Sequence, residues 1–390
     1  MATAESTRAP GLTRAIQTFL DGEPRPTPFL VIDLDVVSER YDSLAAALPE
    51  ADIFYAVKAN PDPDVLRTLL ARGCRFDVAS VGEIDLCTSI GATGEQMSFG
   101  NTIKKVDAIR HAYEAGIRLF AFDAMSELEK LDRLAPDATV FCRVLCDGSG
   151  ADWPLSRKFG CAPDLAVDLL FAAAASGHPV GVSFHVGSQQ RDVGAWDRAL
   201  AMVADLFAAL RGCDIEPAVV NIGGGFPGTY LEPAPAIEEY GAAIRRALAR
   251  RFGTHLPRLI AEPGRYMVAD AGVVETEVVS VTKKARFDEQ RWVFLDVGTY
   301  GGLAEAAGEA LRYRFVTPRA HDTAGPVVIA GPTCDSVDIL YEQTTYQFPL
   351  SLEAGDRIQI LGAGAYTTTC SSVGFNGFPP LAAYVVGGDR

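Results

Sequence analysis

The sequence has 390 residues, of which 48% are hydrophobic and 22% are charged, which is the composition of a globular protein with a large core. Its formal net charge of -15 argues against nucleic acid as a partner, because a phosphate backbone requires a basic surface. No stretch has the pattern of a signal peptide or a membrane span, and the eight cysteines form no CxxC pair, so we expect a cytoplasmic protein with no membrane contact and no metal site.

From about Asp52 onward, short apolar runs alternate with longer amphipathic segments. The strand-like runs read DIFYAVKAN, CRFDVAS, QMSFGN, IRLFAFD, TVFCRVL, GVSFHVGS, VVNIGGG and RLIAEPGR. Strand–helix alternation indicates parallel pairing, and eight such units are the number that closes a (β/α)8 barrel. An open doubly wound sheet is the alternative architecture for the same pattern.

The pattern changes after Arg265, where strand-like runs follow one another with turns but no helices between them. Such a pattern predicts an antiparallel β domain. The early apolar segment Pro28–Val37 precedes the first barrel unit and is expected to pair with that domain. The predicted organisation is therefore an N-terminal segment at 1–36 that pairs with the β domain, a barrel at 37–265 and a C-terminal β domain at 266–390.

Polar residues interrupt the apolar runs at corresponding places, near the C-terminal ends of the predicted strands. They are Lys58, Asp77, Asn101, Arg143, His185, the run Gly223–Gly225, and Glu262. In a parallel barrel this is the end at which active sites are built. Any one of these residues could simply cap a strand, but together they predict an active site at the barrel mouth.

Lys58 lies near the end of the apolar run FYAVKAN. An ammonium group at the end of a buried strand is costly unless it has a partner or a function. A partly desolvated lysine can form a Schiff base with a carbonyl compound. The alternative is a lysine whose head group reaches solvent or pairs with an acid.

Two glycine turns are candidates for binding an anion. In NIGGGFPG, three consecutive glycines allow backbone N–H groups to converge on a phosphate, although the motif is neither a P-loop nor a GxGxxG turn. In AEPGRY, Arg265 could hold a phosphate with two hydrogen bonds, and the hydroxyl of Ser188 could add another. Either turn could also have a purely structural role.

Glu262 and His185 are the candidates for contact with a planar cofactor. Glu262 could pair with a protonated ring nitrogen, or instead form a salt bridge with an arginine of the barrel. His185 could stack on the face of a ring, whereas an isolated strand histidine is more often a satisfied core residue.

The C-terminal region contains GPTCDSVD and GAYTTTCSSVGFNGF. The thiol of Cys334 could donate a proton, although most cysteines are small buried apolar residues. Asp335 could bind the cationic end of a substrate, and Tyr366 lies in a segment that could fold over a ligand.

The motifs YAVKAN, FDVAS, SFHVGS, NIGGGFPG, EPGRY, GPTCDSVD, GAYT and FNGF together closely resemble one family. These are the pyridoxal-phosphate-dependent basic amino acid decarboxylases, which include ornithine, lysine/ornithine and diaminopimelate decarboxylases. The resemblance runs from about Pro28 to the C-terminus. It implies an α/β plus β fold, namely an alanine-racemase-like (β/α)8 TIM barrel with a C-terminal antiparallel β domain, and a homodimer whose active sites are shared between subunits.

The resemblance also implies roles for individual residues. Lys58 matches the lysine that holds pyridoxal 5'-phosphate as an imine, Glu262 the acid on the pyridine nitrogen, and His185 the histidine that stacks on the ring. Cys334 matches the acid that reprotonates the α-carbon, and reaches with Asp335 into the partner's barrel. The remaining matches are Asp77 and Arg143 at the barrel mouth and, for the phosphate, Ser188, Gly223, Gly224, Gly225, Gly264, Arg265 and Tyr366.

The expected reaction is decarboxylation of L-ornithine to putrescine, with L-lysine to cadaverine as a second reaction. The order Cys-Asp-Ser favours a plain distal ammonium, because diaminopimelate decarboxylases usually carry glutamate where Asp335 stands. Either Glu305 or Glu309 could supply a second acid, and Tyr300 and Phe375 are further candidates for substrate contact. Decarboxylation of diaminopimelate or a modified diamino acid, amino-acid racemisation and a catalytically silent regulatory homologue remain as alternatives.

Overall fold

The protein is described here by a computed structural model that covers residues 11–155 and 158–388, and its chain divides into two compact units. The barrel unit comprises Ser38–Pro227 and Ala234–Met267. The β unit comprises the residues up to Val37, the short segment Gly228–Pro233 and the chain from Val268 onward. The sequence pattern did not separate the segment Gly228–Pro233 from the barrel.

Eight parallel strands close the barrel, with β11 pairing back to β2. In barrel order, the strands are β2 (Ala51–Ala56), β3 (Arg75–Val78), β4 (Met97–Phe99), β5 (Leu119–Phe122), β6 (Thr139–Arg143), β8 (Val180–Ser183), β10 (Val219–Asn221) and β11 (Arg258–Ala261). The closed barrel confirms the predicted fold class and excludes the open doubly wound sheet. Each of the eight strand-like sequence runs contributes one strand.

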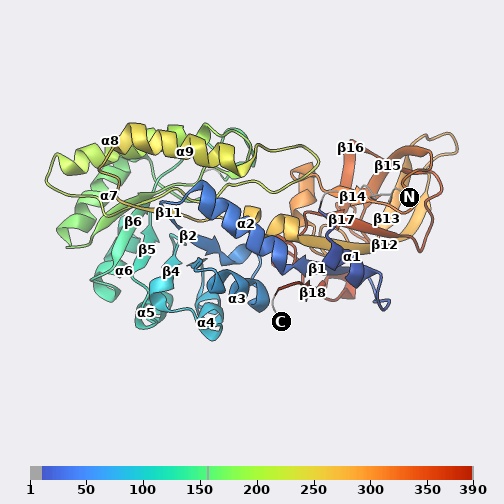
Figure 1. The fold of residues 1–390 in the computed structure, drawn as a ribbon, viewed down its shortest axis with the longest axis horizontal. Helices are drawn as coiled ribbons and strands as arrows, with labels where there is room; N and C mark the ends of the chain where they lie inside the picture. Colours follow the sequence, from blue (N-terminus) through green and yellow to red (C-terminus); the bar gives the residue numbers. More distant parts are fainter. Residues whose placement is uncertain (1–10, 156–157, 389–390) are drawn as a thin grey trace, which may run out of the picture. The chain divides into compact units, whose positions relative to one another are not determined.

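Helices surround the barrel strands (Figure 1). They are α2 (Leu34–Ala47), α3 (Pro63–Ala71), α4 (Val81–Ser89), α5 (Val106–Glu114), α6 (Met125–Leu134), α7 (Pro163–Ala175), α8 (Ala195–Arg211) and α9 (Ile237–Phe252). The single turn α10 (Arg265–Val268) follows β11 in the sequence. Local chemistry sets where they begin: the Asp62 side chain accepts a hydrogen bond from Asp64 N in front of Pro63, and the Ser80 side chain caps α4.

The interior of the barrel is filled by apolar side chains from several strands. One buried cluster contains Phe54, Leu119, Ala121, Phe141, Val219 and Ile260. Burying one of the larger side chains of this cluster, such as Phe54 or Ile260, stabilises the fold by about 1.5–3 kcal/mol. Because alternate residues of a strand share one face, this cluster also identifies which positions further along each strand point into the barrel.

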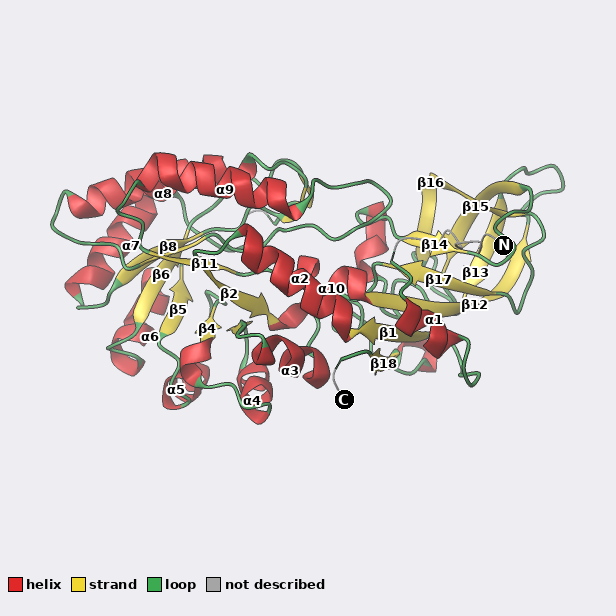
Figure 2. Cartoon of the chain, in the orientation of Figure 1, coloured by secondary structure: helices red, strands yellow, loops and turns green. Residues whose placement is uncertain are grey.

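The β unit is built on an eight-stranded sheet, with few helical residues (Figure 2). Its strands are β1 (Phe29–Asp33), β12 (Gly272–Thr282), β13 (Arg291–Leu295), β14 (Arg314–Val316), β15 (Ala324–Ala330), β16 (Ile339–Pro349), β17 (Arg357–Leu361) and β18 (Ala382–Val386). Most pairs are antiparallel, as predicted, but β1 pairs with β18 and β13 with β15 in parallel. The N-terminal strand β1 also pairs with β12.

Helix α1 (Arg14–Leu20) packs on this sheet through the buried Ile16, which clusters with Phe29 and Val273. The short strands β7 (Ala151–Trp153) and β9 (Ser188–Gln190) pair with each other in the barrel unit.

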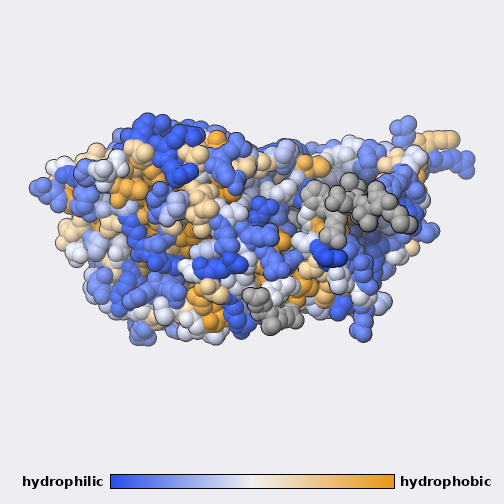
Figure 3. Space-filling view, in the orientation of Figure 1, coloured by the Kyte–Doolittle hydropathy of each residue, from blue (hydrophilic) through white to orange (hydrophobic). Residues whose placement is uncertain are grey.

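In the described part of the chain, no helix is both long and apolar enough to cross a bilayer. The face drawn in Figure 3 carries mostly hydrophilic side chains, with the hydrophobic ones scattered in small patches.

Candidate active site

Two of the predicted residues continue the inward-facing positions of their strands. Arg143 lies two residues after the core residue Phe141, and Glu262 lies two residues after Ile260. Both side chains therefore belong to the face that lines the barrel, at its C-terminal end. Lys58 follows β2 directly, in the 3-10 turn Val57–Ala59.

Lys58 and Asp77 meet at the barrel mouth, where Lys58 Nζ lies 3.5 Å from Asp77 Oδ2. Burial raises the pKa of the Asp77 carboxyl group, while the positive charges of Lys58 and Arg143 act to lower it. The other oxygen, Asp77 Oδ1, is buried without a partner in hydrogen-bonding geometry. An acceptor in this state is costly in a closed core, and its position at a barrel mouth is typical of a binding site.

Gly100, at the end of β4, leaves the space that these carboxylates occupy. A Cβ atom at this position would lie 2.1 Å from Asp77 Oδ1 and 3.4 Å from Glu262 Oε1. The sequence reasoning selected the next residue, Asn101, whose Nδ2 donates to Ala79 O at 3.5 Å. Asn101 thus contacts the turn after β3, and Gly100 is the residue that faces the carboxylates.

The Glu262 side chain is fixed by Asn221, a residue that the sequence reasoning missed. Asn221 Nδ2 donates to Glu262 Oε1 at 2.5 Å, and Asn221 Oδ1 accepts from Gly223 N at 2.9 Å. Burial, with the negative charge of Asp77, raises the pKa of Glu262 to about 7, and the Asn221 hydrogen bond opposes this rise. The signal for Asn221 was present in VVN, because it lies two residues after the inward-facing Val219.

His185, which follows β8, is held with a neutral ring. Its Nδ1 atom accepts a hydrogen bond from Gly187 N at 3.1 Å. Burial lowers the pKa of His185 to about 3, and the nearby charges of Arg143 and Lys58 act in the same direction. A neutral imidazole at this place can pack against the face of a planar ring without adding a further positive charge.

The glycine run packs tightly between the ends of β8 and β11. Gly223 and Gly225 have φ of +65° and +104°. A Cβ atom on Gly223 would lie 2.1 Å from Phe184 O, and one on Gly224 would lie 2.6 Å from Glu262 O. Only glycine therefore fits this close approach of the backbone to its neighbours.

Arg265 and Ser188 lie together in the barrel unit. The Arg265 Nη2 and Nε atoms donate to Ser188 Oγ at 3.0 and 3.3 Å. The arginine is buried, and it begins the short helix α10, whose first turn includes a hydrogen bond from Met267 N to Gly264 O. The structure therefore pairs the two residues that the sequence reasoning assigned to one anion.

Lys104, after β4, is a buried cation that the sequence reasoning did not single out. Its ammonium group donates to Ala121 O at 2.6 Å, Asn101 O at 3.0 Å and Thr102 O at 3.1 Å, and none of its side chain is exposed. Burial lowers the pKa of Lys104 to about 8, and the charge of Glu127, 3.6 Å away, opposes this. Lys104 thus ties the chain that follows Gly100 to the end of β5.

A second group of predicted residues lies within the β unit. The Tyr300 hydroxyl donates to Asp335 Oδ2 at 2.9 Å, and its ring stacks on Phe375 with centroids 4.4 Å apart. Cys334 is exposed, and its backbone N–H donates to Asn376 Oδ1 at 3.0 Å. The hydrogen bonds from Val337 N and from Tyr300 lower the pKa of Asp335, so this carboxylate is anionic at neutral pH. These contacts hold a thiol, a carboxylate and two aromatic rings in one place.

The other candidates of the β unit have different surroundings. Tyr366 has a φ of +57°. Glu309 Oε1 accepts from the N–H groups of Glu342 and Gln343, and its Oε2 accepts from both the N–H and the hydroxyl of Thr344. Burial acts to raise the pKa of Glu309, but these hydrogen bonds prevail and lower it. Glu305 is half-buried in the 3-10 segment Ala304–Glu309.

Comparison with known proteins identifies the family. Residues 34–269 match the family model of the pyridoxal-dependent decarboxylases, pyridoxal binding domain. The chain is 35% identical over 360 residues to the lysine/ornithine decarboxylase of Selenomonas ruminantium, covering 90% of this chain and 88% of the relative. The structure of lysine/ornithine decarboxylase from Vibrio vulnificus complexed with putrescine superposes with a TM-score of 0.81 at 32% identity, covering 92% of this chain and 94% of that one. The structure of arginine decarboxylase from Paramecium bursaria Chlorella virus, bound to agmatine, superposes with a TM-score of 0.86 at 28% identity, covering 95% of this chain and 99% of that one.

The barrel, the β unit and these relatives define a fold type III decarboxylase that uses pyridoxal phosphate. The chain belongs to the family of pyridoxal-dependent decarboxylases. It is a pyridoxal-phosphate-dependent carboxy-lyase that acts on a basic amino acid, as the resemblance of its motifs implied.

The residues at the barrel mouth fit this cofactor. The glycine backbone and the Arg265–Ser188 pair suit a phosphate group, and the neutral His185 suits the face of a ring. Glu262, whose pKa is raised by burial, gains a favourable partner when a protonated ring nitrogen is placed beside it. The buried, unpaired Asp77 Oδ1 supplies a further acceptor.

Proposed function

We propose that this enzyme decarboxylates L-ornithine to putrescine and carbon dioxide and that L-lysine is a slower second substrate. The observation that carries this proposal is the Asp335 carboxylate, fixed by Tyr300 and kept anionic by its hydrogen bonds. A carboxylate held in this way suits a plain distal ammonium. Lysine/ornithine decarboxylases among the relatives support the same substrate class.

We further propose how the barrel residues hold the cofactor. Lys58 would hold the cofactor through its side-chain amine, and Asp77, 3.5 Å from Lys58 Nζ, would stabilise a positive charge on that nitrogen. Glu262, oriented by Asn221, accepts the hydrogen bond of the protonated ring nitrogen. His185 packs on the ring, and Arg143 lies beside it as a positive group at the barrel mouth.

The phosphate is assigned to two sets of donors. One set is the turn of Gly223, Gly224 and Gly225, in which Gly223 N itself donates to Asn221 Oδ1, and the other is Arg265 with Ser188 and the turn at Gly264. The Arg265–Ser188 hydrogen bond presets the guanidinium orientation, which reduces the ordering needed when an anion binds. Tyr366 is proposed as a further phosphate contact.

Pyridoxal phosphate, when bound, accepts the electron pair that the departing carboxylate leaves on the α-carbon. Before that step, Asp335 binds the distal ammonium of the substrate and so sets which bond of the α-carbon is held for cleavage. The Cys334 thiol delivers a proton from Sγ to the α-carbon. Tyr300 and Phe375 form an apolar wall for the substrate's methylene chain. Glu305 is assigned as the second acid, because the oxygens of Glu309 already accept four hydrogen bonds from its neighbours.

Two copies of the chain are proposed to assemble as a homodimer. Cys334 is exposed in the β unit and Asp335 lies beside it, so both can reach a partner's barrel. In that arrangement each active site takes its cofactor residues from one subunit and its proton donor from the other. Mixing Lys58→Ala and Cys334→Ala subunits, each inactive alone, is expected to restore about a quarter of wild-type activity through random pairing, since half of the pairs have one intact site.

A substrate panel tests the proposed specificity. Purified enzyme is supplied with ornithine, lysine, arginine, 2,4-diaminobutyrate and diaminopimelate, and the amine products are identified by mass. We expect the highest kcat/KM for ornithine, with lysine lower by roughly ten- to 200-fold, because one methylene contributes about 1–3 kcal/mol of discrimination. A preference for arginine or diaminopimelate contradicts the substrate assignment, and loss of optical rotation without carbon dioxide release indicates a racemase.

A further inference from the structure

Two cysteines outside the cofactor site lie in contact inside the barrel unit. Cys142, on β6, and Cys161, after the loop that follows β6, have their sulfur atoms 3.5 Å apart. Both residues are buried, with Cys161 5% exposed. None of the roles proposed above uses either thiol.

This thiol pair lies at the base of the loop that joins β6 to the following helix. Leu145 N donates to Cys161 O, and Cys161 N donates to Arg143 O, so the two ends of the loop pair like adjacent strands. Gly160 N donates to Asp123 Oδ2 at 2.7 Å, and a Cβ atom on Gly160 would lie 3.1 Å from Leu145 N. The chain at Val144–Leu145 and at Gly160–Cys161 therefore forms one narrow neck at the base of the loop, where the two sulfurs lie in contact.

We propose that Cys142 and Cys161 are a peroxide-sensitive dithiol whose reversible disulfide lowers the decarboxylase activity by displacing Arg143. The bond requires the sulfurs to approach from 3.5 Å to about 2.05 Å, which is a movement of about 1.5 Å. Arg143 is the residue next to Cys142, and its carbonyl group accepts the hydrogen bond from Cys161 N. A displacement at the neck is thus transmitted directly to a residue at the barrel mouth.

The two thiols have unequal roles in this oxidation. The two sulfurs share a hydrogen bond, and this contact lowers the pKa of Cys161 and raises that of Cys142. The Cys161 thiolate attacks hydrogen peroxide, giving a sulfenic acid and releasing water once a proton is taken up. The Cys142 sulfur then attacks the Cys161 sulfur, forming the disulfide and releasing a second water. In total, two thiols and one peroxide give one disulfide and two waters.

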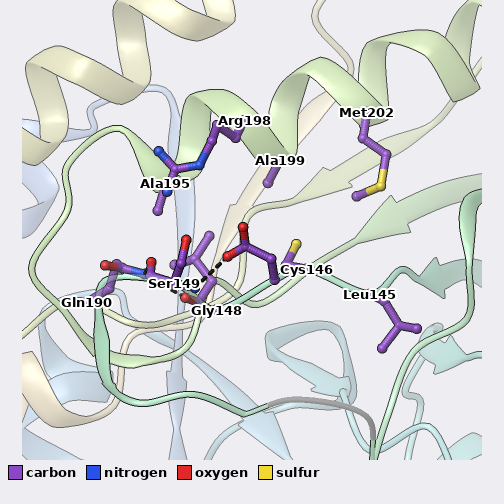
Figure 4. Close-up of a pocket in the computed structure, with 11 residues that line it drawn as sticks. Leu145, Cys146, Gly148, Ser149, Gln190, Ala195, Arg198, Ala199 and Met202 are labelled. Atoms are coloured by element: carbon purple, nitrogen blue, oxygen red, sulfur yellow. Dashed lines mark hydrogen bonds between the residues drawn. The ribbon is translucent and has the colours of Figure 1, made fainter.

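The surroundings leave room for the loop to move. A cavity of about 160 Å³ lies between the loop segment Leu145–Ser149 and helix α8 (Figure 4). Arg198, Ala199 and Met202 line it from the helix, and Cys146 and Ser149 from the loop. The loop segment next to the neck can therefore shift toward α8 without displacing close-packed core atoms.

The holoenzyme, treated with increasing hydrogen peroxide, tests the proposal. We expect a mass lower by two hydrogen atoms and, in the proteolytic digest, one linked peptide pair containing Cys142 and Cys161. Because a misplacement of about 1 Å can cost about 100-fold in rate, kcat/KM is expected to fall roughly ten- to 100-fold, with recovery in dithiothreitol. Formation of no linked pair while the exposed Cys213 is oxidised overturns the proposal.

Cys334 is exposed and is expected to be oxidised under the same conditions, so matched variants separate the two effects. Cys161→Ser and Cys142→Ala cannot form the disulfide, and any activity loss that they retain comes from other residues, the exposed Cys334 among them. Cys213→Ser, on an exposed residue, is the control and keeps the full response. If both pair variants lose activity with peroxide as wild type does, the disulfide does not control the reaction, even where the linked peptide forms.

Discussion

Replacing Glu262 by glutamine is expected to stabilise the apoprotein at alkaline pH while it impairs cofactor use. Burial raises the pKa of Glu262 from 4.5 to about 7. A carboxyl group with a raised pKa contributes stability that is fully present below the unfolded pKa and is lost as pH rises through the folded pKa. The wild-type protein therefore has a lower free energy of unfolding above about pH 7 than at acidic pH. The neutral glutamine can still accept the Asn221 hydrogen bond and does not lose this stability.

The magnitude follows from the pKa difference. At about 1.4 kcal/mol per pKa unit, the difference between 4.5 and about 7 corresponds to about 3 kcal/mol. Because Glu262 retains some contact with solvent at the barrel mouth, screening reduces this value, and we expect about 1–3 kcal/mol at pH 8. Near pH 4.5 the variant and the wild-type protein are expected to have the same free energy of unfolding.

Urea unfolding of the cofactor-free proteins at pH 5 and pH 8, at one protein concentration, measures this difference. Glu114→Gln, on an exposed residue of α5, is the matched control and is expected to show no change with pH. A Glu262→Gln effect that is the same at both pH values would refute the inference that the Glu262 carboxyl group is desolvated. The holoenzyme provides the second readout, because the variant lacks the anionic partner for the ring nitrogen and is expected to lose turnover.

Three further predictions concern the cofactor site and the proton donor. Lys58→Ala is expected to gain no cofactor mass after borohydride reduction, whereas wild type does, and a labelled variant would contradict the assignment of Lys58. Gly223→Ala is expected to weaken cofactor affinity at least about tenfold by titration, because its new Cβ meets Phe184 O, whereas Gly177→Ala, with φ of +93° but open space, is expected to bind normally. Cys334→Ala is expected to bind the cofactor normally and to lose about 100-fold or more in kcat, and unchanged turnover would exclude its role as an acid.

The barrel could be predicted because each strand and helix left a clear local signal. The apolar runs are short, they are bounded by turns, and polar residues mark their C-terminal ends. Lys58 and Asp77, which lie 3.5 Å apart, were both selected in this way, since a charged residue in an apolar run is visible in the sequence. The partners of such residues are less visible when they are small or neutral, as with Gly100 and Asn221.

Other features depend on contacts between distant segments. The parallel pairs β1–β18 and β13–β15 were not predicted, because a short apolar strand does not by itself indicate the direction of its neighbour. The surroundings of Glu309 depend on backbone N–H groups of residues 342–344, which the chain brings to it only through the folded sheet. The sequence alone therefore could not distinguish Glu309 from Glu305 as the second acid.

The enclosure of Lys104 has a consequence for chemical labelling of this protein. Amine reagents attack the unprotonated form, and a pKa of about 8 would rank this residue ahead of ordinary surface lysines. Yet three carbonyl oxygens surround its nitrogen and no part of its side chain meets solvent. At neutral pH, the labelling yield of Lys104 in the folded chain thus reports reagent access and not basicity.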